Sequence, residues 1–310
     1  MKKLLKICSP TKGRSLKVML PKVCNYRCSY CFQEKTDGQY NPHFFTNDKL
    51  ETIGAVVEKF NIERIVLIGG EPTLFDLFPL IKNLRKLLIK ELFIITNFSP
   101  PNDYFIKIQK SVNEVGSVLK LCCSLHEEFV DYKLFVDKVN ELFNQGVKHV
   151  AVEFVVAQHN LNCCFQIINY IKNKLYKDVF VIVDCDMFDE NVKRFYETHQ
   201  LNHTIKAKGL NLSLVYEDGN IEFASRQELR LKAIPVDKYC LTDLVLSESN
   251  MLSTCFRSLR SADELLEIDD LFLNEEKFKC SASYCRFCDN PQIFFEKENF
   301  KELLKAHRNK

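Results

Sequence analysis

Three cysteines stand within one short segment of the chain, Cys24-Asn25-Tyr26-Arg27-Cys28-Ser29-Tyr30-Cys31. They are separated by three residues and then by two, so local chain geometry can bring all three thiolates to one metal centre. Thiolates are the usual ligands of iron–sulfur clusters and of zinc. Closed sites of both kinds usually take four protein ligands, so three cysteines leave one coordination position open. Open positions are where metals do chemistry.

Three other uses of these cysteines have to be weighed. Disulfides suit small secreted domains, but residues 1–8 lack the apolar core of a signal peptide and the chain is too long to need such staples. A redox pair of the thioredoxin type would use Cys28 and Cys31 and leave Cys24 idle. A structural zinc site would need a fourth ligand, and the nearest histidine is His43.

A second motif, Gly69-Gly70-Glu71-Pro72, follows later in the chain. Together the two motifs resemble those of the radical S-adenosylmethionine (radical SAM) enzymes, with Tyr30 as the aromatic residue of the cysteine motif. The resemblance implies that Cys24, Cys28 and Cys31 bind three irons of a 4Fe-4S cluster and that the fourth iron chelates SAM. It implies that Tyr30, Gly69, Gly70 and Glu71 bind the cofactor. It also implies the chemistry, which is reductive cleavage of SAM to a 5′-deoxyadenosyl radical that takes a hydrogen atom from a substrate.

The chain that must position these motifs has 310 residues, of which 46% are hydrophobic and 27% are charged. These are the values of an ordinary globular protein. Its 43 Lys and Arg residues nearly balance its 41 Asp and Glu residues, so we expect no nucleic-acid partner. No apolar run approaches the roughly 20 residues that cross a bilayer. Without an export signal, we expect a cytoplasmic enzyme whose 14 cysteines stay reduced and that has no membrane partner.

Short apolar runs alternate with longer amphipathic stretches over the first two thirds of the chain. The runs predicted as strands are 16–20, 64–68, 92–96, 119–125, 147–156 and 179–183. The stretches predicted as helices are 48–60, 77–89, 103–115, 130–144 and 163–174. The alternation predicts an α/β fold, a partial (β/α)6 barrel with helices outside, and both motifs follow predicted strands at the end where such barrels carry chemistry.

The alternation of predicted strands and helices ends after residue 183, which predicts a three-part organisation. Residues 1–15 form an N-terminal arm, 16–200 the radical SAM partial barrel, and 201–310 a small cysteine-rich, cluster-binding appendix. Within the appendix, hairpins are expected over 212–223, around the turn pair Asp218-Gly219, and over 244–255.

Strand alternation predicts the side chains that line the barrel. Lys120 and His126 lie on the inward face of the run 119–125, and Glu153 turns inward from the following strand. A charge inside a barrel is costly unless it is paired or used. Glu153, Lys120 and His126 are therefore candidates for substrate contacts, and a salt bridge from Lys120 or Lys17 to Glu153 is the alternative.

The family resemblance implies further neighbours of the cofactor. Ser124, also inward on its strand, resembles a serine that several family members use near SAM. Asn160, after the strand that carries Glu153, resembles another cofactor neighbour. Asn97 matches a common family pattern whose role the sequence does not give.

Five more cysteines lie in the appendix: Cys240, Cys255, Cys280, Cys285 and Cys288. The arrangement resembles the appendix of the SPASM and twitch subgroups, which implies one auxiliary 4Fe-4S cluster on Cys240, Cys255, Cys285 and Cys288, with Cys280 as a spare. The same four thiolates would also suit zinc. Where those relatives usually have a glycine in the hairpin, this chain has Asn250, which tolerates a left-handed turn less readily.

The leading hypothesis is a radical SAM enzyme of oxidoreductase or mutase type, acting on a peptide or a small metabolite. A low-potential donor such as a flavodoxin or ferredoxin would reduce its cluster. The 15 residues before the first barrel strand leave no room for an N-terminal peptide-recognition domain, which weakens the case for a leader-guided peptide. The alternatives are a non-catalytic zinc-binding interaction protein and a radical SAM enzyme whose tail binds structural zinc.

Overall fold

A computed structural model describes most of the first two thirds of the chain and short pieces of the rest. The described residues are 4–8, 14–31, 33, 40–186, 188–201, 212–216, 218–224, 234–235, 239–240, 244–253, 260–261, 284–285 and 294–295. The chain divides into two compact units, one of residues 15–207 and one that combines residues 1–14 with 208–310.

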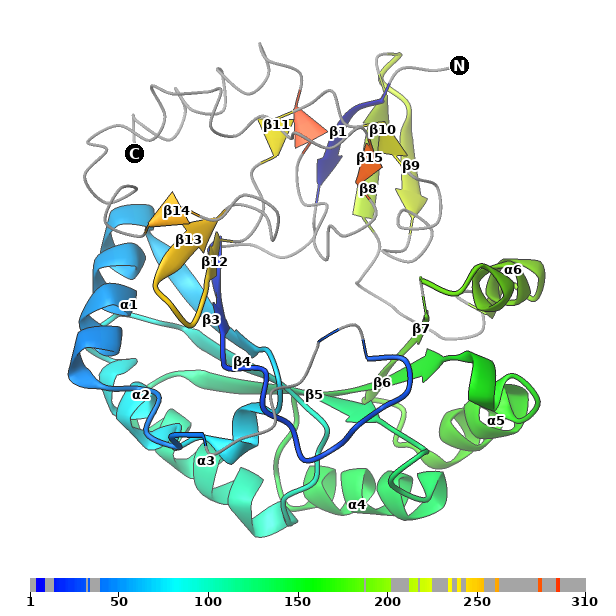
Figure 1. Ribbon diagram of the computed structural model, residues 1–310, viewed down its shortest axis with the longest axis horizontal. Coiled ribbons are helices and arrows are strands. Elements are labelled where there is room, and N and C mark those ends of the chain that lie inside the picture. Colours follow the sequence, from blue (N-terminus) through cyan, green and yellow to red (C-terminus); the bar gives the residue numbers. More distant parts are fainter. Residues whose placement is uncertain are drawn as a thin grey trace. The chain divides into compact units, whose positions relative to one another are not determined.

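The first unit is built on a curved sheet with the strand order β2-β3-β4-β5-β6-β7 (Figure 1). Strands β3 to β7 pair in parallel, each with the next along the chain. The strands are β2 (Arg14–Met19), β3 (Ile62–Ile68), β4 (Glu91–Thr96), β5 (Val118–Leu125), β6 (Val150–Val156) and β7 (Phe180–Cys185). This is the partial α/β barrel that the sequence predicts.

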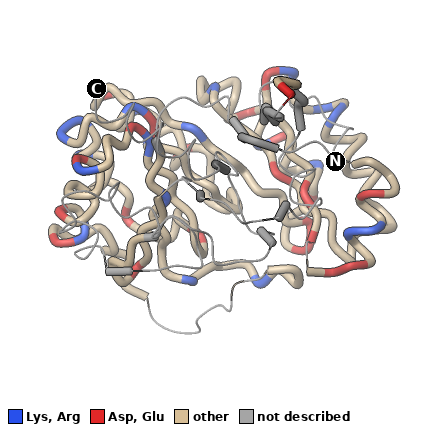
Figure 2. Tube along the Cα trace, turned by 90° about the horizontal axis from the view of Figure 1, so that it is seen from above, with Lys and Arg blue, Asp and Glu red and all other residues tan. Residues whose placement is uncertain are grey.

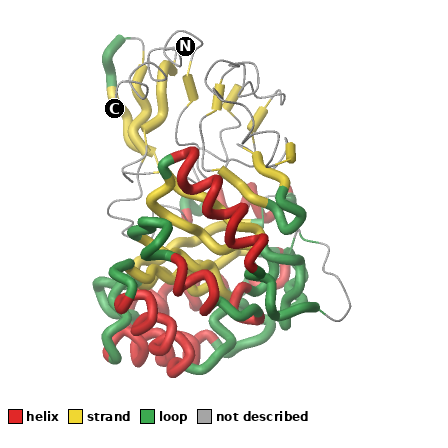
Figure 3. The backbone as a smooth tube through the Cα atoms, turned by 90° about the vertical axis from the view of Figure 1, so that its left-hand side faces the viewer, coloured by secondary structure: helices red, strands yellow, loops and turns green. Residues whose placement is uncertain are grey.

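Helices connect successive strands and cover the outer side of the sheet (Figure 3). They are α1 (Asn47–Phe60), α2 (Phe78–Asn83), α3 (Asn102–Glu114), α4 (Tyr132–Asn144), α5 (Cys164–Lys174) and α6 (Glu190–Thr198), with short 3-10 turns η1 (Pro72–Leu74) and η2 (Gln158–Asn160). Side chains of Thr46, Asp131 and Asp189 accept backbone N–H groups at the starts of α1, α4 and α6. Such caps satisfy donors that have no partner inside a helix.

Strand β6 buries one of its two faces almost completely. Val150, Val152, Phe154 and Val156 of β6 are at most 1% exposed, whereas the alternate residues, Glu153 among them, are half-buried. Strand β4 shows the same alternation. The outward apolar face and the inward face with Glu153 are therefore as predicted from the period of two.

Two helices differ from the prediction. Helix α2 is shorter than the expected 77–89, because after Asn83 the chain continues as turns and Leu88 takes a left-handed conformation (φ 56°). Helix α6 was not expected. It is a mostly polar segment that buries only Val192 and Tyr196, so its apolar signal is weak.

The amino-terminal end of the sheet carries a group of three charges. Glu91, at the start of β4, accepts from Arg64 Nε of β3 at 2.5 Å and from Lys120 Nζ of β5 at 2.8 Å. Burial raises the pKa of Glu91, but the hydrogen bonds and charges of Lys120 and Arg64 outweigh it, and the pKa ends below its ordinary value. Lys120 is therefore paired with Glu91, a partner that the sequence analysis did not consider.

The second unit contains several short antiparallel pairings. Strand β1 (Leu4–Cys8) pairs with β8 (Leu212–Tyr216), and β8 pairs with β9 (Ile221–Ala224) as the hairpin expected around Asp218-Gly219. Strands β12 (Leu244–Leu246), β13 (Met251–Ser253) and β14 (Arg260–Ser261) also pair in turn. Asn250, before β13, has a φ of 59°, the left-handed turn considered above.

Residues 1–14 thus belong with the C-terminal residues, and part of the expected arm is a strand. That pairing could not be predicted from local sequence patterns, since more than 200 residues separate β1 from β8. The roles of the predicted barrel and appendix stay predictions.

Basic and acidic residues are interspersed along the described trace (Figure 2). Among the described helices, none combines the length and the hydropathy that a bilayer-spanning helix needs.

Candidate functional site

The cysteine segment follows β2 and lies against the Gly69–Glu71 turn that follows β3. Backbone hydrogen bonds join the two segments: Leu20 N–H donates to Ile68 (2.8 Å), Gly70 N–H to Pro21 (3.3 Å) and Glu71 N–H to Val23 (2.7 Å). The two predicted motifs are therefore neighbours at the carboxyl ends of adjacent strands.

Both glycines are needed for this contact. A Cβ on Gly69, whose φ is +129°, would lie 2.4 Å from the Leu20 carbonyl oxygen, and one on Gly70 would lie 1.9 Å from that of Val23. Real Cβ atoms do not approach oxygen so closely. The absent side chains thus make room for the chain that leads into the cysteines.

Glu71 is 1% exposed, and its carboxylate is surrounded by donors of the protein. Oε1 accepts from the backbone N–H of Thr73 (2.9 Å) and from the hydroxyls of Thr73 (2.5 Å) and Thr96 (2.7 Å), and Oε2 accepts from the N–H of Asn97 (2.6 Å). Burial raises the pKa of Glu71, and these hydrogen bonds oppose the rise. The carboxylate therefore ties the turn after β3 to the end of β4.

Asn97, directly after β4, contacts the cysteine segment. Its Nδ2 donates to Asn25 Oδ1 at 2.7 Å and lies 3.7 Å from Cys24 Sγ. The backbone N–H of Tyr26 also points to this sulfur, at 3.4 Å. Cys24 therefore lies among N–H donors, which favour a thiolate.

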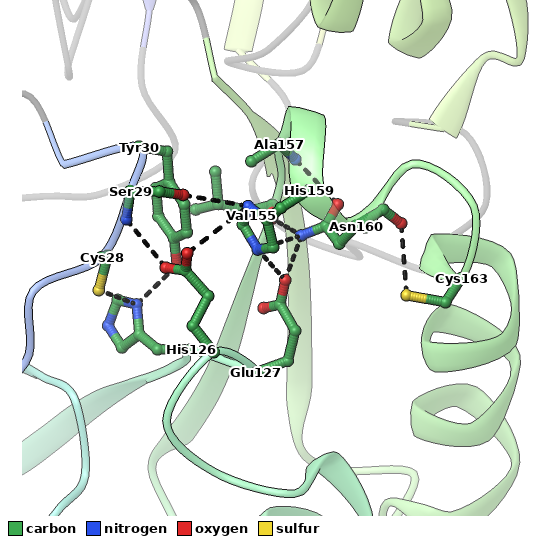
Figure 4. A network of polar contacts seen from close by, with 11 residues as sticks. Cys28, Ser29, Tyr30, His126, Glu127, Val155, Ala157, His159, Asn160 and Cys163 are labelled. Carbon is green, nitrogen blue, oxygen red and sulfur yellow. Dashed lines mark hydrogen bonds and ion pairs between the residues drawn. The ribbon is translucent and has the colours of Figure 1, made fainter.

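Cys28 and Tyr30 meet His126 at the end of β5 (Figure 4). The Nδ1 atom of His126 lies 3.3 Å from Cys28 Sγ and 2.6 Å from the Tyr30 hydroxyl. Burial, and then the negative charges of Cys28, Glu127 and Glu128, raise the pKa of Tyr30 far above its ordinary value. Tyr30 thus stays neutral and its hydroxyl can donate a hydrogen bond.

A polar network joins the cysteine segment to the loops after β5 and β6 (Figure 4). Ser29 N–H donates to Glu128 Oε2 at 2.9 Å, and Ser29 Oγ lies 3.2 Å from His159 Nδ1. His159 Nε2 pairs with Glu127 Oε1 at 2.5 Å, and the His159 ring stacks on Tyr30 with an interplanar angle of 8°. The segment is therefore anchored on two further strands.

Asn160 is 1% exposed and fixes the turn after β6. Its Oδ1 accepts the Ala157 N–H (2.9 Å), while its Nδ2 donates to the Val155 carbonyl (3.0 Å) and to Glu127. Its polar atoms already have partners within the protein, so the predicted place of Asn160 beside a cofactor stays a prediction.

The three predicted cleft residues lie at different heights in the barrel. His126 follows the carboxyl end of β5, close to the cysteines. Glu153 accepts a hydrogen bond from Ser124 Oγ at 3.3 Å, and Ser124 is one residue before the end of β5. Lys120, paired with Glu91, is six residues before His126, roughly 20 Å along an extended strand. The structure brings His126 to the cysteines and sets Lys120 apart from them.

Sequence reasoning missed Glu127, Glu128 and His159. The signal was present, because His126-Glu127-Glu128 directly follows an apolar run whose carboxyl end is where chemistry is expected. His159 is adjacent to Asn160, which was predicted. Their joint position could not be read from the sequence, because it depends on the docking of the cysteine segment.

The donor set fits an iron–sulfur cluster. None of the eight cysteines whose side chains the structure describes is in a disulfide, and Cys24, Cys28 and Cys31 are half-buried. Within the described residues, no three Cys, His, Asp or Glu side chains converge on a single metal ion. A cluster does not require that, since each thiolate binds a different iron.

The tail cysteines are only partly described. Cys240 lies in β11 (Tyr239–Cys240), which pairs with β16 (Phe294–Phe295), and Cys285 lies in β15 (Tyr284–Cys285), which pairs with β10 (Ile234–Pro235). Cys255, Cys280 and Cys288 lie outside the described residues. The auxiliary site therefore stays a prediction.

Comparison with known families gives one match that covers both motifs. Residues 18–117 match the model described as the radical SAM superfamily. The matched span contains the three cysteines, the Gly69–Glu71 turn and Asn97.

Curated relatives match about half of the chain. The probable GTP 3′,8-cyclase of Sulfurisphaera tokodaii is 28% identical over 174 residues, 51% of this chain and 53% of that protein. That of Sulfolobus acidocaldarius is 25% identical over 181 residues, 54% of this chain and 55% of that protein. The chain thus spans about half the length of the curated relatives it matches.

Two solved structures share the fold. The structure of anSMEcpe with bound AdoMet has a TM-score of 0.54 and 16% identity, over 95% of each chain. Streptococcus suis SuiB bound to its precursor peptide SuiA has a TM-score of 0.50 and 17% identity, over 88% of this chain and 66% of SuiB.

Proposed function

We propose that this chain, whose residues 18–117 match the radical SAM superfamily, is a radical SAM enzyme that cleaves SAM reductively at a 4Fe-4S cluster bound by Cys24, Cys28 and Cys31. The observation that carries the proposal is the docking of the cysteine segment on the Gly69–Glu71 turn, with 2.7 Å between Glu71 N and the Val23 carbonyl oxygen. The two family motifs are adjacent in space, as a cofactor that contacts both would require.

When bound by Cys24, Cys28 and Cys31, such a cluster would supply one electron to the sulfonium of SAM, which would yield methionine and a 5′-deoxyadenosyl radical able to take hydrogen from the substrate. The protein's role would be to orient SAM and to shield the cluster. We propose that the Gly69–Glu71 turn contacts SAM, and Glu71 holds that turn in place by accepting four hydrogen bonds. His126 lies against Cys28 Sγ and the Tyr30 hydroxyl, and we propose that these two side chains shield the Cys28 side of the cluster.

We propose that the substrate is a peptide or a small metabolite. The likeness to SuiB with its precursor peptide concerns the fold alone. The curated relatives, named probable GTP 3′,8-cyclases, make a nucleoside triphosphate a second candidate, supported by 28% identity over 174 residues. Because the match spans about half of those proteins, their activity is a proposal here.

We further propose that the C-terminal unit binds an auxiliary 4Fe-4S cluster through Cys240, Cys255, Cys285 and Cys288. Four thiolates make a closed site, and structural zinc is the competing occupant. A low-potential flavodoxin or ferredoxin in the cytoplasm would supply the electron for SAM cleavage.

Anaerobic reconstitution followed by dithionite and SAM tests the proposal. We expect a brown protein that forms 5′-deoxyadenosine, and Cys28→Ala should abolish both the iron bound at the segment and that product. Cys163→Ser is the matched control, since Cys163 is half-buried and outside both cysteine groups. Zinc in place of iron, or iron without 5′-deoxyadenosine, would contradict the proposal.

The same assay separates the auxiliary site from the first one. Cys285→Ala should keep 5′-deoxyadenosine formation and lose one cluster's share of iron and the turnover of substrate. Zinc retained in wild type and lost in Cys285→Ala would identify structural zinc in the tail instead.

A further inference from the structure

We infer that Asn97 is a positioning residue that donates a hydrogen bond to the Cys24 thiolate and thereby raises the reduction potential of the cluster. The inference rests on the proposed function, because it concerns the cluster on Cys24, Cys28 and Cys31. It assigns a role to Asn97, which matches a family pattern of no stated role.

The orientation of the Asn97 amide follows from its partners. Its Oδ1 accepts the backbone N–H of Ser99 at 3.0 Å, so its NH2 group must face the other way. On that side lie Asn25 Oδ1 at 2.7 Å and Cys24 Sγ at 3.7 Å. An amide nitrogen carries two hydrogens, so one serves Asn25 and one points to the sulfur.

The backbone of Asn97 is fixed from the side of β3. Its N–H donates to Glu71 Oε2 at 2.6 Å, and the Thr96 hydroxyl donates to Glu71 Oε1 at 2.7 Å. Asn97 is 5% exposed and Glu71 is 1% exposed, so neither contact competes with bulk water. The donor is therefore held in place before any cluster is bound.

The segment after Asn97 is fixed by α3 and α4. Phe98 has a φ of 58°, is 2% exposed, and packs on Phe105 and Phe135 at ring-centroid distances of 4.9 and 5.6 Å. Lys138 Nζ donates to the carbonyls of Phe98 and Pro100, both at 2.6 Å. Because the chain is held on both sides of Asn97, the buried amide group keeps its orientation toward Cys24 Sγ.

A donor fixed in this way acts on the cluster through charge. Reduction adds an electron, part of which resides on the thiolate sulfurs, and an N–H that points at the sulfur stabilises that charge. The reduced state gains more than the oxidised state, so the potential rises. The effect is larger in a buried site, where the effective dielectric constant is low.

Redox titration of the reconstituted protein, followed by electron paramagnetic resonance of the reduced cluster, tests this. Asn97→Ala removes the donor, while Asn97→Asp keeps the shape and the Oδ1 partner of Ser99 but places an acceptor beside the sulfur. At one fixed solution potential, the ratio of reduced to oxidised cluster should fall several-fold in Asn97→Ala and further in Asn97→Asp. A packing defect would give the opposite order, because Ala leaves a cavity and Asp does not.

Asn25→Ala is the control, because it removes the other partner of Nδ2 and leaves the contact with the sulfur. Its ratio should stay near that of wild type. Unchanged ratios in both Asn97 variants would overturn the inference, and so would loss of iron from both while Asn25→Ala retains it, since the amide would then serve assembly alone. A wild-type protein that binds no such cluster would instead refute the proposed function.

Discussion

The Cα atom of Gly70 faces the carbonyl oxygen of Val23 so closely that a Cβ there would lie 1.9 Å from it. From the family resemblance, Gly69 and Gly70 are expected to bind the cofactor. In the structure, the space that side chains at these positions would fill is taken by the chain leading into the cysteines. The glycines therefore let one motif dock on the other, and their contact with SAM stays a prediction.

Gly70→Ala should destabilise the protein without cofactors by about 3 kcal/mol, the upper end of the usual cost of overpacking. The obstructing atoms are backbone atoms of Val23, so relief requires displacement of the whole segment. Urea unfolding followed by circular dichroism measures the change.

Gly54→Ala is the matched control, since its Cβ would meet only Leu87 Cδ2 at an ordinary 3.4 Å inside α1. It should be neutral or up to about 1 kcal/mol stabilising, because Ala favours helices over Gly. Equal stabilities of the two variants would show that the close approach at Gly70 is not required.

The strands and most helices could be predicted because their burial is periodic. Residues such as Val150, Val152 and Phe154 signal a strand by alternation alone, and both motifs follow such runs. The contacts of Glu71 with Asn97 and of Ser29 with Glu128 could not be predicted in the same way. They join loops far apart in the chain, and their polar residues have no period.

Glu71→Gln should cost about 1–3 kcal/mol, the range for a buried backbone donor left without an acceptor. Each carboxylate oxygen accepts a backbone N–H, from Thr73 on Oε1 and from Asn97 on Oε2. A glutamine can offer its oxygen to only one of them, and its NH2 must face the other. Threonine hydroxyls can reverse a hydrogen bond, but a backbone N–H cannot.

Urea unfolding of the protein without cofactors measures this cost, with Glu58→Gln on the exposed face of α1 as the control. A Glu71→Gln variant as stable as wild type would mean that the second carboxylate oxygen is not needed as an acceptor for these backbone N–H groups.

Glu128→Ala should loosen the cysteine segment. It removes the acceptor of the Ser29 N–H, at 2.9 Å, a hydrogen bond whose loss costs about 1 kcal/mol. Because Arg27 lies in this segment and is exposed, trypsin cleavage after Arg27 reports its opening. We expect cleavage about fivefold faster, the equivalent of that free energy.

Glu128→Gln should cleave near the wild-type rate, since its amide oxygen still accepts the N–H. Glu51→Ala, exposed on α1, controls for the change in charge. Fast cleavage in Glu128→Gln as well would show that the charge, rather than the acceptor, holds the segment.

Glu91 should make the folded protein sensitive to acid. Its folded-state pKa lies below the ordinary value of 4.5 because the hydrogen bonds and charges of Lys120 and Arg64 outweigh burial. A carboxyl with a lowered folded pKa contributes stability that is fully present above the unfolded pKa and is lost as pH falls through the folded one. Wild type should therefore exceed Glu91→Gln by on the order of 1 kcal/mol at neutral pH, and this difference should shrink below about pH 4.5.

Urea unfolding of both proteins across that range measures the difference. Glu63→Gln is the control, because Glu63 of β3 pairs with Lys90, the residue before β4, through side chains that are 40% and 69% exposed. Water screens that pair, so its removal should change stability little at any pH. A wild-type advantage over Glu91→Gln that persisted unchanged into acid would mean that the size and packing of the side chain, rather than its charge, stabilise this end of the barrel.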